Sequence, residues 1–175
     1  MMHRPARIAL LGLAFVAWGC APAPKPAQQV SLEIKDYDGL QQVIAAHKGK
    51  VVVLDVWSTS CEPCMKEFPN LVALSRKHPG VAAISLSLDY EGVGKPEAQR
   101  EKVLGFLKQQ DARFDNILAS DDSDTMLKKL GIASMPAVFV YDQSGKRIHT
   151  FDKPGFTYHD IEPEVRKLLG ETTGE

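Results

Sequence analysis

The chain has 175 residues, enough for one compact domain and an export segment but too few for two full domains. Hydrophobic residues make up 44% of the chain and charged residues 25%, a composition typical of an ordinary soluble globular protein. The 21 basic and 22 acidic residues nearly balance, which gives no electrostatic support for binding of nucleic acid or of an anionic membrane surface.

The first residues have the pattern of an export signal. Residues 1–7 form a short positive stretch, and residues 8–18 form an uncharged apolar run. As a helix this run is about 16 Å long, well short of the hydrocarbon core of a bilayer. We therefore predict a signal peptide over residues 1–19 and not a membrane span.

A single cysteine, Cys20, directly follows Gly19 at the end of this segment. A small residue and then a cysteine after the apolar run resembles bacterial lipoprotein signal sequences, which implies that Cys20 is the lipidated first residue of the mature protein. The alternative is an ordinary signal peptide that contains a cysteine, although a secreted protein has little other use for an unpaired thiol. Residues 20–29 are then the lipidated cysteine and a stiff tether rich in proline and alanine.

The rest of the chain alternates between strand and helix patterns. The predicted elements are, in order, a strand at 30–35, a helix from about 38, a strand at 51–57, a helix at 62–77, a strand at 81–88, a helix after 96, a strand near 114–118, a helix at about 121–130, two strands at 136–141 and 146–151, and a helix at about 159–169. The second strand reads VVVLDVW, and this nearly continuous apolar run favours a strand covered on both faces. Pro69 lies inside the second helix and is expected to kink it.

This order of elements predicts the fold class. Alternating strands and helices, followed by a hairpin and a closing helix, indicate an α/β domain whose mixed sheet is flanked by helices on both faces. We expect this domain to span residues 30–170 and residues 171–175 to form a C-terminal tail.

Two further cysteines, Cys61 and Cys64, lie between the apolar strand and the next helix. Sulfur atoms at positions i and i+3 of a first helical turn can close a disulfide with little backbone movement. Unpaired N–H groups and the positive helix end stabilise a thiolate on Cys61, whereas Cys64 lies one turn further in and is expected to be less exposed. Pro63 suits a first turn, where its missing N–H costs nothing.

The run VVVLDVWSTSCEPCMKEFPNL resembles the TlpA/ResA-like branch of the thioredoxin superfamily, down to Cys-Glu-Pro-Cys followed by Glu-Phe-Pro. The resemblance extends over roughly residues 30–170, and Asp89, Gly131 and Met135-Pro136 fall where the family has its landmarks. It implies a thioredoxin-like fold with an N-terminal strand–helix extension and a central insertion.

The same resemblance implies a protein thiol–disulfide oxidoreductase. In such an enzyme the Cys61 thiolate attacks a substrate disulfide, and Cys64 then resolves the mixed disulfide. No metal or dissociable cofactor is required. A second hypothesis is a binding module that keeps the fold and has lost redox turnover, although the intact Cys61, Cys64 and Pro136 argue against it.

Other interpretations of the cysteine pair fit less well. A zinc site needs about two more ligands, and the sequence has neither a second C-x-x-C nor a paired histidine motif. A purely structural disulfide across four residues would stabilise little. A peroxiredoxin motif implies threonine and proline at the positions that hold Ser58 and Val53, and a copper-chaperone relative has a C-x-x-x-C spacing.

Several nearby residues are candidates for supporting roles. By resemblance, the Met135-Pro136 bond is cis beside the disulfide and presents the backbone of Met135 to an extended substrate. Asp55, in the apolar strand, is costly to bury and matches the buried acid of thioredoxins, which helps to deprotonate the inner cysteine; the alternative is a strand-end residue that reaches water. The lysine that often accompanies that acid has no clear counterpart. Glu67 matches the acid of the Cys-Glu-Pro-Cys-x-x-Glu pattern, which implies tuning of thiol acidity; its alternative is a solvated helix residue.

Three residues around the cysteines complete the predicted site. Trp57 is expected to pack against the active-site turn or simply in the core. Ser60 stands where the family most often has tryptophan, which should change how substrate is held. The carboxylate of Glu62 opposes a second negative charge on Cys61, which favours a reductant over an oxidant.

These features predict where the protein works and with what. We expect an exported, lipid-anchored monomer that faces the periplasm or the cell exterior. Its partners are proteins with disulfides, for example apocytochromes before haem attachment, and, by family analogy, a membrane thiol–disulfide electron donor. His47, His78, His149 and His159 show no metal-ligand spacing and are read as solvated or structural.

Overall fold

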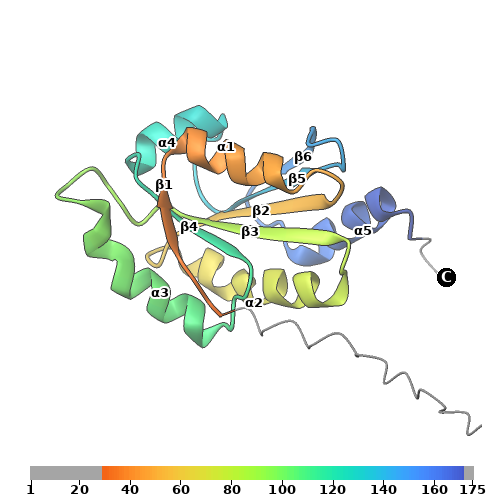
Figure 1. The fold of residues 1–175 in the computed structure, drawn as a ribbon, viewed down its shortest axis with the longest axis horizontal. Helices are drawn as coiled ribbons and strands as arrows, with labels where there is room; N and C mark the ends of the chain where they lie inside the picture. The colour runs from red at the N-terminus through yellow and green to blue at the C-terminus, as the bar shows by residue number, and fades with distance from the viewer. Residues whose placement is uncertain (1–28, 172–175) are drawn as a thin grey trace, which may run out of the picture.

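Six strands form one mixed sheet at the centre of this computed structural model, which describes residues 29–171 (Figure 1). The strands are β1 (Glu33–Lys35), β2 (Val51–Trp57), β3 (Val81–Ser87), β4 (Asp115–Ala119), β5 (Ala137–Tyr141) and β6 (Arg147–Phe151). Their order across the sheet is β1-β4-β3-β2-β5-β6. The first four in this order are mutually parallel, and β5 and β6 are antiparallel to their neighbours.

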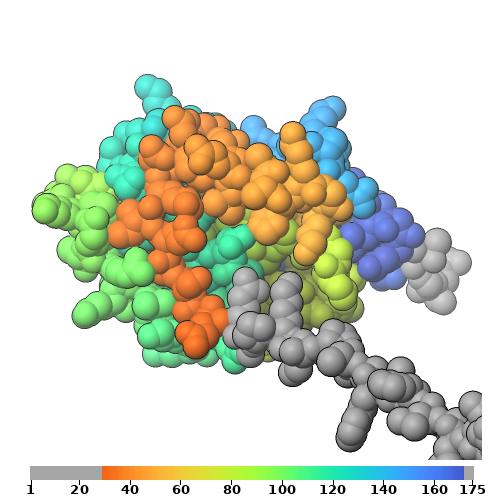
Figure 2. All heavy atoms as spheres, viewed as in Figure 1, coloured from red at the N-terminus to blue at the C-terminus, as the bar shows by residue number. Residues whose placement is uncertain are grey.

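Helices cover both faces of the sheet, as the sequence predicts (Figure 1). They are α1 (Tyr37–Ala46), α2 (Glu62–Lys77), the short 3₁₀ helix η1 (Pro96–Gln99), α3 (Arg100–Gln109), α4 (Ser123–Leu130) and α5 (Tyr158–Leu169). One face carries α1 and α4, and the other carries α2, α3 and α5. Figure 2 shows the residues of α1 and β1, in orange, spread across the front of the molecule, with α3 on one side and α5 on the other.

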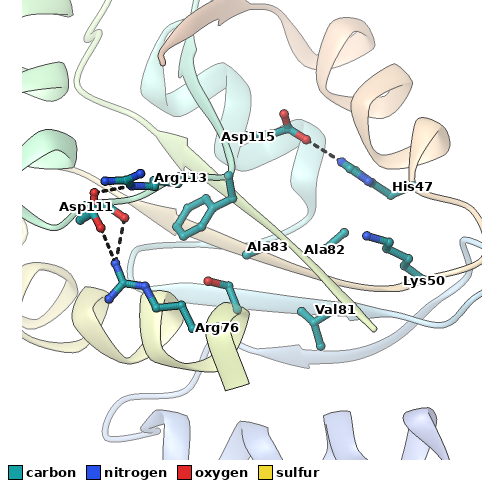
Figure 3. A pocket seen from close by; sticks show the side chains of 11 residues that line it. His47, Lys50, Arg76, Val81, Ala82, Ala83, Asp111, Arg113 and Asp115 are labelled. Atoms are coloured by element: carbon teal, nitrogen blue, oxygen red, sulfur yellow. Dashed lines mark hydrogen bonds and ion pairs between the residues drawn. The ribbon is translucent and has the colours of Figure 1, made fainter. Parts of the chain in front are cut away.

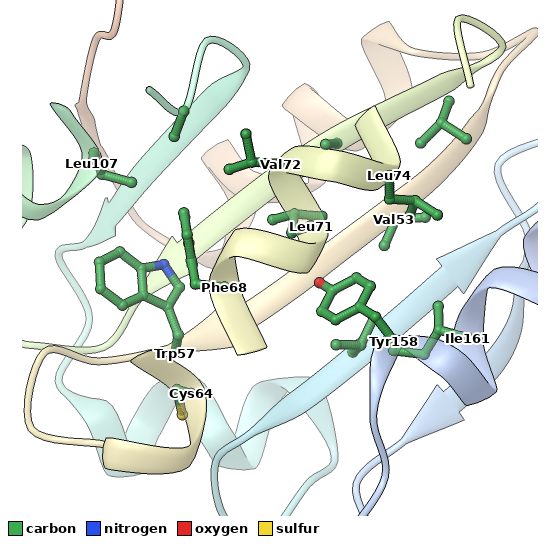
Figure 4. Packing of buried hydrophobic residues seen from close by; sticks show 14 of the residues in the cluster. Val53, Trp57, Cys64, Phe68, Leu71, Val72, Leu74, Leu107, Tyr158 and Ile161 are labelled. Carbon is green, nitrogen blue, oxygen red and sulfur yellow. The ribbon is translucent and has the colours of Figure 1, made fainter. Parts of the chain in front are cut away.

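Strand β2 lies at the centre of the sheet and is buried along its whole length. Val53 and Trp57 point into the cluster under α2, α3 and α5, whereas Leu54 and Val56 point into the cluster under α1 and α4. In Figure 4, Phe68 and other residues of α2 pack against this strand. The continuous apolar run therefore forms the doubly covered strand that its sequence predicts.

Several predicted boundaries differ from the observed ones because of capping. The side chain of Asp36 accepts the backbone N–H of Gly39, so α1 begins at Tyr37. Asp122 caps α4 in the same way, and that helix starts after the predicted residue 121. The N-terminal strand occupies only Glu33–Lys35 of the predicted 30–35. Helix α2 continues through its internal proline, and a kink there stays a prediction.

The extension and the insertion are both present. β1 and α1 precede the central β2, and η1, α3 and β4 stand between β3 and α4. Since β1 is linked to β2 through parallel strands, the chain enters the domain at the end of the sheet opposite the carboxyl end of β2. No helix within residues 29–171 is long and apolar enough to cross a bilayer. The predicted signal peptide, Cys20 and residues 172–175 lie outside the described residues.

Candidate active site

The disulfide between Cys61 and Cys64 lies where β2 ends and α2 begins, and it joins Cα atoms 5.3 Å apart. Cys61 is the N-cap of α2, and its Sγ accepts a hydrogen bond of 3.3 Å from the backbone N–H of Cys64. The first N–H groups of a helix lack intrahelical partners and favour negative charge at this point. Cys61 is half-buried, Cys64 is 2% exposed, and Glu62 and Pro63 between them are exposed. The outer sulfur thus occupies the more accessible and more electropositive position.

The turn before Cys61 is held by the buried carboxylate of Asp89, which lies just after β3. The backbone N–H of Thr59 donates to both carboxylate oxygens of Asp89, at 3.0 and 3.2 Å, and its hydroxyl donates to the same side chain. Ser87 adds a hydrogen bond of 2.7 Å from the end of β3, and Lys102 lies 3.4 Å away. Sequence reasoning named Asp89 only as a family landmark. The sequence places this carboxylate directly after a buried strand that neighbours the strand before the cysteines. That position could have predicted its contact with the turn.

A cleft of about 450 Å³ opens beside the disulfide. Its walls come from the first turns of α2, from the segment before β5 and from the loop between β6 and α5, and its lining includes Pro63, Glu67, Met135, Pro136 and Phe156. The peptide bond between Met135 and Pro136 is cis, as the family resemblance implies. Because Pro63 lies between the two cysteines in the chain, the cleft lies next to the disulfide.

Asp55 is buried in the core, with 4% of its surface exposed, and Tyr158 donates a hydrogen bond of 2.6 Å to its Oδ2. Burial raises the pKa of the Asp55 carboxyl to about 7, partly offset by the Tyr158 hydrogen bond, and the negative charge of Glu67 raises it further. The alternative of a strand-end residue that reaches water is therefore wrong. The partner of this acid is a tyrosine 103 residues away, which no local pattern indicates.

Glu67 is half-buried one turn after Cys64 and faces the first turn of α5. Its Oε2 accepts hydrogen bonds from the backbone N–H of Tyr158, at 3.3 Å, and from the side chain of Asn70, at 3.1 Å. A helix N-terminus attracts a carboxylate, which gives this side chain a defined position. The interpretation of Glu67 as a merely solvated helix residue does not describe this arrangement.

Trp57 is fully buried and belongs to the aromatic part of the core. Its ring centroid lies 4.9 Å from that of Phe68 and 4.9 Å from that of Phe106. Cys64 lies in the same cluster, directly after the turn that Trp57 precedes (Figure 4). Within the described chain, Trp57 Nε1 is the one buried side-chain nitrogen or oxygen without a hydrogen-bond partner. Trp57 is thus a core aromatic that packs against α2 and α3, and its packing against the active-site turn stays a prediction.

A second hollow, of about 300 Å³, lies at the opposite end of the sheet (Figure 3). Most of its charged side chains are paired with one another: Arg76 and Arg113 with Asp111, and His47 with Asp115. Since it lies far from the disulfide along the strands, it takes no part in the cysteine site.

The chain is similar to known proteins in sequence and in structure. The model of the Redoxin family matches residues 22–168. The thiol-disulfide oxidoreductase ResA of Bacillus thuringiensis subsp. konkukian (strain 97-27) is 31% identical over 137 residues, which are 77% of this chain and 73% of that protein. The sporulation thiol-disulfide oxidoreductase A of Bacillus subtilis (strain 168) is 28% identical over 143 residues, 79% of this chain and 82% of that protein.

Solved structures share the fold. One, described as a thiol:disulfide interchange protein DsbE from Chlorobium tepidum, has a TM-score of 0.57 at 26% identity and covers 73% of this chain and 84% of its own. The observed sheet with helices on both faces is therefore the thioredoxin-like fold that the sequence predicts.

The raised pKa of Asp55 predicts a pH-dependent stability. Between pH 4 and 7 the unfolded chain has lost this proton while the folded protein keeps it, so stability falls as pH rises through that window. Asp55→Asn removes this pH dependence. The difference in free energy of unfolding between the variant and the wild type should therefore be more favourable to the variant by about 3 kcal/mol at pH 8 than at pH 5. Urea unfolding of the oxidised proteins measures this. Asp152→Asn, at an exposed acid of the cleft, is the control, and equal pH dependence of both variants would contradict the assignment.

Proposed function

Because the chain belongs to the Redoxin family and is a ResA-like thiol–disulfide oxidoreductase, we propose that it reduces disulfides of exported proteins, with Cys61 as attacking and Cys64 as resolving thiol. The observation that carries the proposal is the position of the disulfide. One sulfur is accessible at a helix N-terminus, the other is buried, and a cleft with a cis proline lies beside both.

The reaction starts from the dithiol form. The thiolate of Cys61 attacks one sulfur of the substrate disulfide, forms a mixed disulfide and releases the other substrate sulfur as a thiolate. Cys64 then loses its proton, and its thiolate attacks Cys61. The bond between the two enzyme cysteines forms, the second substrate sulfur leaves, and two electrons have passed from enzyme to substrate. An electron donor must then reduce the enzyme, and we assign this to a membrane thiol–disulfide protein.

The cleft suggests how substrate is held. Pro136 has no backbone N–H, so no donor competes at the sulfurs from that residue, while the backbone of Met135 is available to pair with an extended segment. Apocytochromes are one substrate class that we propose, because their paired cysteines must be reduced before haem attachment. A redox-inactive binding module would need neither the paired sulfurs nor their difference in exposure.

Trapping tests the roles of the two cysteines. Cys64→Ser should accumulate a mixed disulfide on Cys61 in the native cell envelope, because the resolving thiol is gone. Cys61→Ser should trap far less, since the remaining thiol is buried. Non-reducing electrophoresis and mass spectrometry of the adducts measure this, with insulin reduction by the wild type as the activity control. Equal trapping by both variants would overturn the assignment.

The residues between the cysteines favour a reductant. A thiolate that is strongly stabilised makes a protein an oxidant, and a carboxylate at Glu62 disfavours a second negative charge on Cys61. We expect a reduction potential nearer to thioredoxin's, about −270 mV, than to DsbA's, about −120 mV. Equilibration with dithiothreitol or glutathione buffers gives the value. Glu62→Gln should raise it by tens of millivolts, and a wild-type potential above about −180 mV would show an isomerase or oxidant instead.

We also propose that the protein is a monomer tethered to the membrane by lipid on Cys20, on the periplasmic or outer side. The support is the sequence pattern of residues 1–20 and the place where the chain enters the domain, at the end of the sheet away from the cysteines. A tether there leaves the cleft free for substrate.

Metabolic labelling with a fatty-acid analogue tests the anchor. The wild-type protein should carry the label, and Cys20→Ala should lose it and leave the membrane fraction. Cys61→Ala, which keeps Cys20, is the matched control and should stay labelled. A label that survives Cys20→Ala would overturn the proposal.

A further inference from the structure

Tyr158, the first residue of α5, contacts two carboxyl groups on two other elements. Its hydroxyl donates to Oδ2 of Asp55 on β2 at 2.6 Å, and its backbone N–H donates to Oε2 of Glu67 on α2 at 3.3 Å. The residue is 5% exposed. In Figure 4 its ring extends from α5 into the cluster that also contains Cys64. One residue near the end of the chain thus joins both acids of the site.

Few other polar groups surround the buried carboxyl of Asp55. In the described part of the chain, the bond from Tyr158 is the one hydrogen bond that the Asp55 side chain makes. Its neighbours in the adjacent strands are the uncharged Ser85 and Val138. The titratable groups that act on it are Tyr158 from α5 and Glu67 from α2. Val53 and Trp57, on either side of Asp55 on the same face of β2, belong to the cluster that contains Cys64.

We propose that Tyr158 is a positioning residue for the resolving half of the reaction: it holds Asp55 ready to accept the proton of Cys64. The inference rests on the proposed resolving role of Cys64. In this step the Cys64 thiol gives its proton to the Asp55 carboxylate, and the resulting thiolate attacks Cys61 of the mixed disulfide. The phenol keeps its own proton throughout, because burial and the charge of Asp55 hold the pKa of Tyr158 well above its usual range.

The geometry explains why a tyrosine suits this place. Its hydroxyl supplies one hydrogen bond to the ionised form of Asp55 without bringing a second charge into the core, as a lysine would. Its backbone N–H binds the carboxylate of Glu67 at the start of α5. The negative charge of Glu67, which opposes ionisation of Asp55, is therefore held in one position. Removing only the hydroxyl should therefore make Asp55 ionise at higher pH.

The test is Tyr158→Phe, which keeps the buried ring and removes the donor. Carboxyl ¹³C NMR of the oxidised protein, with the Asp55 signal assigned by Asp55→Asn, should show its titration midpoint about one pH unit higher than in wild type. The pH profile of Cys64 alkylation in a Cys61→Ala background should move in the same direction. Asp55→Asn with Tyr158→Phe should shift that profile no further than Asp55→Asn alone.

Tyr141→Phe is the matched control, because Tyr141 is also buried but lies in the cluster on the opposite face of the sheet. It should leave the Asp55 midpoint unchanged. An unchanged midpoint in Tyr158→Phe, or an equal shift in Tyr141→Phe, would overturn the inference. The oxidised-state titration needs no turnover, so failure of the proposed reductase activity is distinguishable: insulin reduction by the wild type would be absent while the NMR result still decides the role of Tyr158.

Discussion

The burial of β2 on both faces is the constraint on which the site depends. The strand lies between β3 and β5, and its residues alternate into two separate clusters. Neither face can move without opening a core, so the carboxyl end of the strand is fixed. The chain leaves that end through a turn held by Asp89 and enters α2 at Cys61. The disulfide therefore gains its position from packing and its polarity from the helix end.

The same burial creates the main electrostatic cost of the fold. A carboxyl in the middle of β2 has to face the core, because alternate residues of a doubly covered strand have no route to water. The protein meets this cost with one phenol from α5 and with partial neutralisation of Asp55, not with an ion pair. Cys61, only six residues later, lies at a helix N-terminus that favours the anion. Two groups close in sequence thus lie in opposite environments, which suits the separate roles proposed for them, attacking thiol for Cys61 and proton acceptor for Asp55.

Local patterns in the sequence predict much of the fold and of the cysteine site. The run VVVLDVW and the helical spacing after Cys61 predict β2, α2 and the difference in exposure of the two sulfurs, because each rests on neighbouring residues. The contact between Asp55 and Tyr158 joins residues 103 positions apart and depends on how α5 packs on the sheet. The sequence of neither segment predicts it. Helix starts shifted by one or two residues where Asp36 and Asp122 turned out to be caps, since an aspartate before a helix fits several positions.

The topology also separates the two ends of the domain. Val30 precedes β1, and because β1 is parallel to β2 through β4 and β3, it lies at the opposite end of the sheet from Cys61. The seven residues of β2 span about 23 Å, and any ten residues in an extended polyproline-type conformation span about 30 Å. An anchor at Cys20 would thus allow the domain to present its cleft away from the bilayer or to turn it back towards a membrane partner. With the proposed anchor, reduction of a substrate and reduction of the enzyme by the proposed membrane donor would be separate encounters of the same cleft, with the domain in different orientations relative to the bilayer.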